Sequence, residues 1–146
     1  MNLSTKIINW EDPKINIKLK LSGLWIASMF LFLYVDLFGF FIPGFTEKVI
    51  AGEVGHTGIP ITQGFLLAVI ILMMIPSLMI FLSLTLQAKA NRWTNIVVGI
   101  LKIVAVVGGM IGESWIYYIF ASVVELVLLS LIIWYAWTWP KLESGI

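Results

Sequence analysis

Four long apolar runs, each able to cross a lipid bilayer as a helix, constrain this chain more than any other feature. They lie at about 19–42, 60–87, 93–112 and 114–139. About 20 helical residues cross a hydrocarbon core of about 30 Å, and a chain in lipid has to satisfy its backbone polar groups internally. An apolar fraction of 60% with 12% charged residues is too apolar for a soluble fold of 146 residues. The sequence therefore predicts an all-α integral membrane protein, a four-helix bundle.

The connections between the runs contain helix breakers. Pro43 and Gly44 follow the first run, and a turn at 112–114 separates the third from the fourth. Short turns force neighbouring helices to be antiparallel. The longest connection, 43–60, has two interpretations: residues 46–53 form one or two helical turns on the outer face, or Gly52, Gly55 and Gly58 make the segment mobile. We divide the chain into a basic cytoplasmic leader at 1–18, a transmembrane domain at 19–142 and a cytoplasmic tail at 143–146.

The sequence contains no cysteine and a single histidine. There is no Cys, which excludes disulfides, thiolate metal sites and Cys nucleophiles. The single His, His56, cannot complete a metal or haem site alone. The net charge of +1 gives no electrostatic footprint for nucleic acid. We therefore expect no metal, no cofactor and no nucleic-acid partner.

The distribution of Lys and Arg predicts the orientation in the membrane. Of the eight Lys and Arg in loops or termini, seven fall in the leader, the 87–93 loop or the tail, and only Lys48 falls on the other side. Short loops that carry an excess of positive charge stay in the cytoplasm. The sequence thus predicts a multi-pass protein of the inner (plasma) membrane, with both termini cytoplasmic and the lipid bilayer as its main partner.

Three charged residues lie well inside the predicted spans: Asp36, Lys102 and Glu125. A charge at membrane depth costs about 2.5–3.5 kcal/mol on insertion scales, so such side chains face the bundle interior. At about 1.5 Å per helical residue, Lys102 and Glu125 fall near the midplane, and Asp36 lies about 9 Å nearer the outer surface. We expect Lys102 and Glu125 to approach within salt-bridge or one-water distance.

Helical periodicity places further polar residues on the same inward faces. In the third run, polar and small residues recur at steps of three and four and form one stripe. The predicted polar cluster comprises Asp36, Lys102, Glu125, Gln63, Asn95, Glu113 and Tyr118. One interpretation is a buried Lys102–Glu125 pair that only fixes helix register. The other is that surplus carboxylates around one lysine carry a proton or bind a cationic group.

Several short segments resemble an uncharacterised prokaryotic family of small four-helix membrane proteins and the broader DoxX-like group. They are Glu11-Asp12-Pro13-Lys14-Ile15, Leu24-Trp25-Ile26, Tyr34-Val35-Asp36, Ile75-Pro76-Ser77-Leu78-Met79, Asn91-Arg92-Trp93-Thr94-Asn95 and Trp134-Tyr135-Ala136-Trp137. The resemblance implies the fold and no proven activity. Some DoxX-like proteins are membrane subunits of quinone-linked oxidoreductases, and this sequence has no obvious redox ligands.

Three functions from different classes are compatible with these observations. The first is an ion- or small-ligand-handling protein, transporter- or channel-like, that uses the intramembrane Asp/Lys/Glu cluster. Because four short helices enclose little volume, we expect a permeation path to need a homo-oligomer. The second is a non-catalytic accessory or assembly subunit of a membrane complex. The third, an intramembrane enzyme acting on a lipid or quinone, is ranked last because the sequence provides no catalytic nucleophile or metal site.

Overall fold

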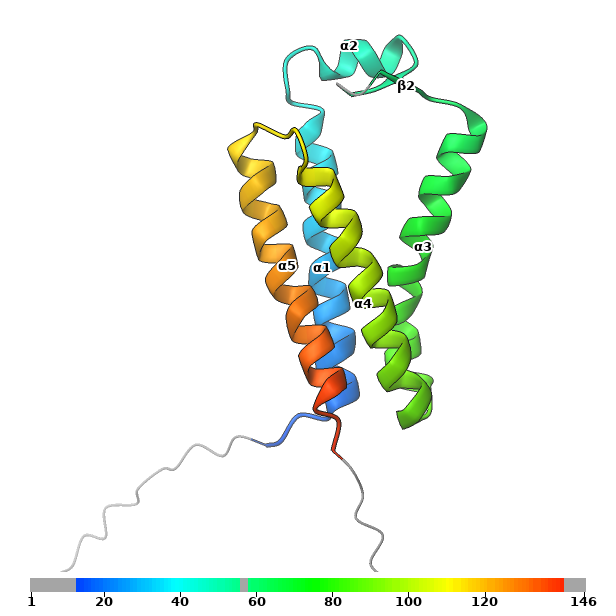
Figure 1. Ribbon diagram of the computed structural model, residues 1–146, viewed down its shortest axis with the longest axis vertical. Helices are drawn as coiled ribbons and strands as arrows, with labels where there is room; N and C mark the ends of the chain where they lie inside the picture. The colour runs from blue at the N-terminus through cyan, green and yellow to red at the C-terminus, as the bar shows by residue number, and fades with distance from the viewer. Residues whose placement is uncertain (1–12, 56–57, 141–146) are drawn as a thin grey trace, which may run out of the picture.

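The computed structural model describes residues 13–55 and 58–140, and in this part of the chain it is a bundle of four long helices (Figure 1). Each is long and apolar enough to cross a membrane, as predicted. The four helices are α1 (Ile17–Gly39), α3 (Gln63–Thr85), α4 (Ala88–Met110) and α5 (Ile116–Trp137). A smaller unit connects α1 to α3. It consists of α2 (Phe45–Ile50) and the antiparallel strands β1 (Glu53–Val54) and β2 (Ile59–Pro60).

The helices begin and end within a few residues of the predicted spans, with one larger difference. We predicted the third span to begin at 93, whereas α4 begins at Ala88 and leaves only two residues between α3 and α4. Hydropathy reports which residues prefer lipid, and Lys89 and Arg92 are polar but good helix formers. The first turn of α4 is therefore helical without being apolar.

Side chains close the ends of the helices. Asn16 Oδ1 accepts a hydrogen bond from the Lys18 backbone N–H at the start of α1, and Thr62 does the same for Phe65 at the start of α3. The Lys18 ammonium donates to the carbonyl oxygens of Leu84 (3.3 Å) and Leu86 (2.7 Å). A cation at these unpaired carbonyls stabilises the end of α3 and ties it to the beginning of α1.

The four helices run antiparallel to their chain neighbours. The first residue of α1 and the last residue of α5 lie at one end of the bundle, called the Ile17 end below, and α2 lies across the other, called the α2 end (Figure 1). Helix α3 is beside α4 near the Ile17 end and diverges from it toward the α2 end (Figure 1). The orientation of these ends relative to the cytoplasm stays a prediction.

The tightly packed core lies in the half of the bundle near the Ile17 end. Its fully buried side chains come from α1, α3, α4 and α5 and include Leu21, Trp25, Met79, Leu129 and Ile132. Most of α3 is exposed, as expected for a helix that faces lipid tails.

Glycine lets α4 approach α5 closely. A Cβ added at Gly99 would lie 2.9 Å from Ile133 Cγ1, and one added at Gly109 would lie 2.6 Å from Tyr118 Oη. The small residues of the α4 stripe therefore have a packing role, as is usual between membrane helices.

Candidate functional site

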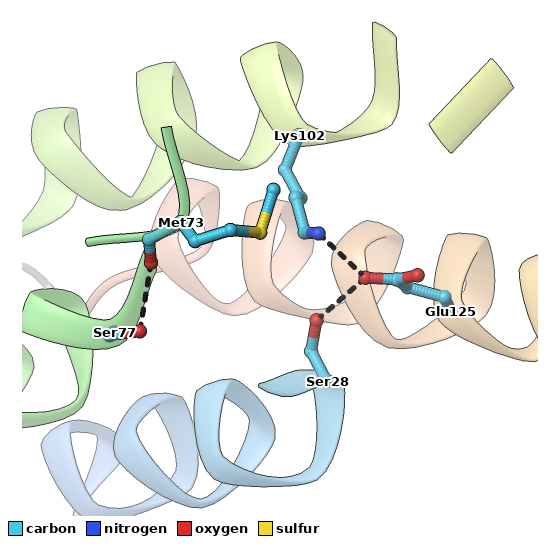
Figure 2. A network of polar contacts seen from close by, with 5 residues as sticks. All are labelled: Ser28, Met73, Ser77, Lys102 and Glu125. Atoms are coloured by element: carbon cyan, nitrogen blue, oxygen red, sulfur yellow. Dashed lines mark hydrogen bonds and ion pairs between the residues drawn. The ribbon is translucent and has the colours of Figure 1, made fainter. Parts of the chain in front are cut away.

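The centre of the bundle contains the ion pair that the sequence predicts. Lys102 Nζ of α4 lies 3.3 Å from Glu125 Oε1 of α5, and both side chains are 5% exposed. The predicted approach of these two residues is thus confirmed. Figure 2 shows the two side chains pointing toward one another, with the Met73 side chain of α3 beside Lys102.

Two residues of α1 complete this pair, and the sequence analysis missed both. Ser28 Oγ donates a hydrogen bond to Glu125 Oε1 (3.2 Å), and the Lys102 ammonium lies 3.9 Å from the centroid of the Phe32 ring. A cation over an aromatic face gains up to about 2 kcal/mol where water is excluded. The pair is therefore held by three helices: Ser28 and Phe32 from α1, Lys102 from α4 and Glu125 from α5.

A second buried polar network lies nearer the Ile17 end. Trp25 Nε1 and Ser83 Oγ both donate to Asn95 Oδ1, at 2.7 and 3.2 Å. Asn95 Nδ2 donates to the backbone oxygen and to Oδ1 of Asn91, whose own Nδ2 donates to the Ser83 carbonyl (2.6 Å). Each of these four residues is fully buried. Asn95 therefore belongs to a network that joins α1, α3 and α4, separate from the ion pair.

A cavity of about 1080 Å³ occupies the α2 end of the bundle. It is open on one side and is lined by the ends of α1, α3, α4 and α5 that lie at this end, and by α2 and β1. Phe45 of α2 is one of the lining residues, and its ring lies within 3.0–3.8 Å of where a Cβ would stand at Gly55 and at Gly39. The residue at 55 has a φ of +50°, which glycine adopts without strain.

Asp36 lies in the lining of this cavity, not in the ion pair. It follows Ser28 and Phe32 along one face of α1 at steps of four, and is therefore one helical turn, about 6 Å, beyond Phe32. Among the described residues Asp36 has no hydrogen bond and no ion pair, and Lys102 and Glu125 act on it only through their charge. Neither residue of the pair lines the cavity; Val35 and Asp36 are the lining residues of α1 nearest the pair, and the Asp36 side chain is exposed.

Two tyrosines from the first turn of α5 accompany Asp36 in the lining. Tyr117 and Tyr118 form a perpendicular ring pair, with centroids 6.4 Å apart. The Tyr117 hydroxyl reaches Gly39 of α1, and the Tyr118 hydroxyl reaches Gly109 of α4. The sequence analysis selected Tyr118 and missed its neighbour, although both polar aromatics stand at the same depth.

The other two predicted residues have different surroundings. Glu113 Oε1 accepts hydrogen bonds from the backbone N–H groups of Ser114 (2.8 Å) and Trp115 (2.9 Å), so this carboxylate holds the turn before α5 while lining the cavity. Gln63 is exposed at the start of α3 and does not line the cavity. His56 lies outside the described residues.

The seven predicted residues thus occupy several places. Lys102 and Glu125 form the central pair, and Asn95 belongs to the second network nearer the Ile17 end. Asp36, Glu113 and Tyr118 line the cavity. No group of three His, Cys, Asp or Glu that could hold a metal ion occurs in residues 13–55 and 58–140.

Comparison with known proteins adds the family and no activity. No curated protein and no solved structure matches the chain. The similarity to the DoxX-like group stays a prediction. One family matches residues 5–145, nearly the whole chain, and it is described as a family of unknown function. With four helices that can span a membrane and a match along almost its full length, the protein belongs to that family, DUF6326.

Proposed function

We propose that the protein binds a small ligand or ion inside the membrane, in the cavity at the α2 end, and that Asp36 is the residue that holds it. The observation that carries this proposal is the cavity of about 1080 Å³ whose lining includes the unpaired carboxylate of Asp36. Ligand sites in proteins are typically apolar cavities of about 300–1,000 Å³ with a few polar groups. A carboxylate within a membrane span that no protein group neutralises is costly unless a ligand, a proton or water compensates it.

The Lys102–Glu125 pair supports this site from the side of the Ile17 end. It connects α1, α4 and α5 one to two helical turns beneath Asp36, and so fixes the three helices that carry Asp36, Gly109 and Tyr118. Phe32 lies between the pair and Asp36 along α1. The cavity therefore fits a binding pocket or a transporter closed on one side better than an open channel.

The proposed orientation makes the α2 end the outer face. The described Lys and Arg of the leader and of α4 lie toward the Ile17 end, which by the positive-inside rule is cytoplasmic. A ligand would then enter from outside or from the outer leaflet. One copy of the chain supplies the lining of this cavity, so binding does not need the homo-oligomer that we predicted for a permeation path.

Thiol labelling tests whether the cavity is open to water at Asp36. The chain has no Cys, so a single introduced thiol reports its own position. Maleimide reacts with the thiolate, which forms in water and not among lipid tails. Asp36 and Leu37 are both exposed, but only Asp36 lines the cavity, so in liposomes Asp36→Cys should react at least about tenfold faster than Leu37→Cys.

The Leu37→Cys variant is the matched control, because it stands at nearly the same depth and does not line the cavity. Equal rates at the two positions would contradict the proposal, since the Asp36 position would then be as dry as the lipid face. After unfolding in dodecyl sulfate the two thiols should react with maleimide at the same rate, which shows that both are chemically competent.

The accessory-subunit function has one observation in its favour. The two polar networks around Glu125 and Asn95 are hydrogen-bonded and buried, as expected where polar groups only hold helices together. Such a subunit, of the kind found among DoxX-like proteins, needs no cavity. For an accessory subunit, Asp36→Asn should leave the stability and the function of the protein unchanged. The ligand-binding proposal instead requires the Asp36 carboxylate.

A further inference from the structure

We infer that the cavity at the α2 end takes an organic monovalent cation with an apolar, aromatic-sized body. This inference rests on the proposed function and names the class of its ligand. It follows from the charge of the cavity lining, from the aromatic residues in that lining, and from the small number of polar groups available.

The charge of the lining has a single sign. Among the described residues, the charged lining residues are Asp36 and Glu113, and no Lys, Arg or His lines the cavity. A site without a basic group cannot compensate a phosphate or carboxylate ligand at membrane depth. The lining is therefore complementary to a cation and repels an anion.

The two carboxylates differ in how they are held. Glu113 Oε1 accepts two backbone hydrogen bonds in the turn before α5, which stabilise its charge, whereas Asp36 has no hydrogen bond from a described residue. Asp36 is therefore the carboxylate that most needs a positive charge from a ligand, and one such charge balances it. A divalent metal ion needs about six oxygen ligands, and this lining does not supply them.

Aromatic rings line the same cavity as Asp36. Tyr117 and Tyr118 line it as a perpendicular pair from α5, and Phe45 lines it from α2. The faces of such rings attract cations, more strongly where water is excluded. Weakly hydrated organic cations gain most from this arrangement, because they lose little hydration when they enter.

The remaining lining is apolar and extends along α3. Phe65, Leu66 and Val69 form the wall where α3 diverges from α4 (Figure 1). A ligand that fills about 1080 Å³ against this wall needs a large apolar surface as well as its charge. An inorganic monovalent cation would satisfy Asp36 and leave the rest of the cavity unused.

Two ions of the same shape and opposite charge test the inference. Tetraphenylphosphonium and tetraphenylborate have the same four rings around a central atom. Equilibrium dialysis against the full-length protein in a neutral detergent should show saturable binding of tetraphenylphosphonium, at one site per chain, and none of tetraphenylborate. This comparison uses the unaltered protein, so it does not depend on the folding of any variant.

Three variants then assign the binding to Asp36. Asp36→Asn should raise the dissociation constant of tetraphenylphosphonium at least about tenfold, and Asp36→Glu should retain binding because the charge stays. Glu47→Gln is the matched control: it removes an acid from α2 at the same end of the bundle, and Glu47 does not line the cavity. The control should bind as the unaltered protein does.

Saturable binding of tetraphenylborate equal to that of tetraphenylphosphonium would overturn the inference. So would an Asp36→Asn protein that binds the cation unchanged, or an unaltered protein that binds neither ion. Failure here is distinguishable from failure of the proposed function. If Asp36→Cys reacts with maleimide but the cation does not bind, the cavity stands and only its ligand class is wrong. If Asp36→Cys reacts no faster than Leu37→Cys, the proposed function itself fails.

Discussion

Removing one partner of the Lys102–Glu125 pair should be much more damaging than removing both. Both side chains are 5% exposed, so solvent screens neither charge. Breaking a buried pair typically costs about 3–5 kcal/mol, because the remaining charge has no partner. Lys102→Met leaves the Glu125 carboxylate with only the Ser28 hydroxyl, so we expect this full loss. Glu125→Gln should cost less, by up to about 2 kcal/mol, because Phe32 still faces the ammonium.

The double variant Lys102→Met/Glu125→Gln contains no buried charge at this position. Its amide can keep the hydrogen bond from Ser28, so its free energy of unfolding should exceed that of Lys102→Met by at least about 2 kcal/mol. Unfolding in mixed micelles with increasing dodecyl sulfate measures all three values. Leu101→Met, on the exposed face of the same helix, is the control and should change the free energy by less than about 0.5 kcal/mol. A double variant as unstable as the sum of the two singles would refute the reasoning.

Two further predictions concern orientation and packing. In intact cells, an impermeant thiol reagent should label Glu53→Cys at the α2 end and should not label Ala90→Cys at the start of α4; the opposite pattern would invert the topology. Gly99→Ala should lower the free energy of unfolding by about 1–3 kcal/mol, since its Cβ would meet Ile133 at 2.9 Å. Gly23→Ala, where a Cβ would meet nothing within 4 Å, should be neutral or stabilising, and equal losses at the two glycines would contradict this packing argument.

Much of the fold follows from the sequence, because lipid leaves a chain few alternatives. The four helices and their antiparallel order were predicted, and of the two interpretations of the 43–60 connection the structure has the helical one, with α2 beginning at Phe45. The divergence of α3 from α4 was not predicted. Helix α3 is apolar on every face, so its sequence contains no periodicity that shows where its neighbours are.

The candidate site was predictable only in part. Depth and helical phase both place Lys102 beside Glu125, and the structure has them in contact. Ser28 was missed because a neutral hydroxyl in an apolar run costs little, and because Met29 fits the same inward face nearly as well. The separation of Asp36 from the pair depends on how far side chains reach. About 9 Å along the bundle axis is more than an aspartate can bridge, although a lysine can still act on it through its charge.

The two halves of the bundle differ in how firmly they are held. Among the described residues, every side-chain hydrogen bond or ion pair that joins two of the long helices lies at Ser28–Glu125 or nearer the Ile17 end. Around the cavity no side-chain hydrogen bond or ion pair joins two of these helices in residues 13–55 and 58–140. The helices can therefore open locally at the α2 end without breaking a buried polar interaction between them. Backbone amides there should exchange hydrogen faster than those around Asn95. A rigid Ile17 end preserves the fold while a flexible α2 end lets a ligand enter the cavity.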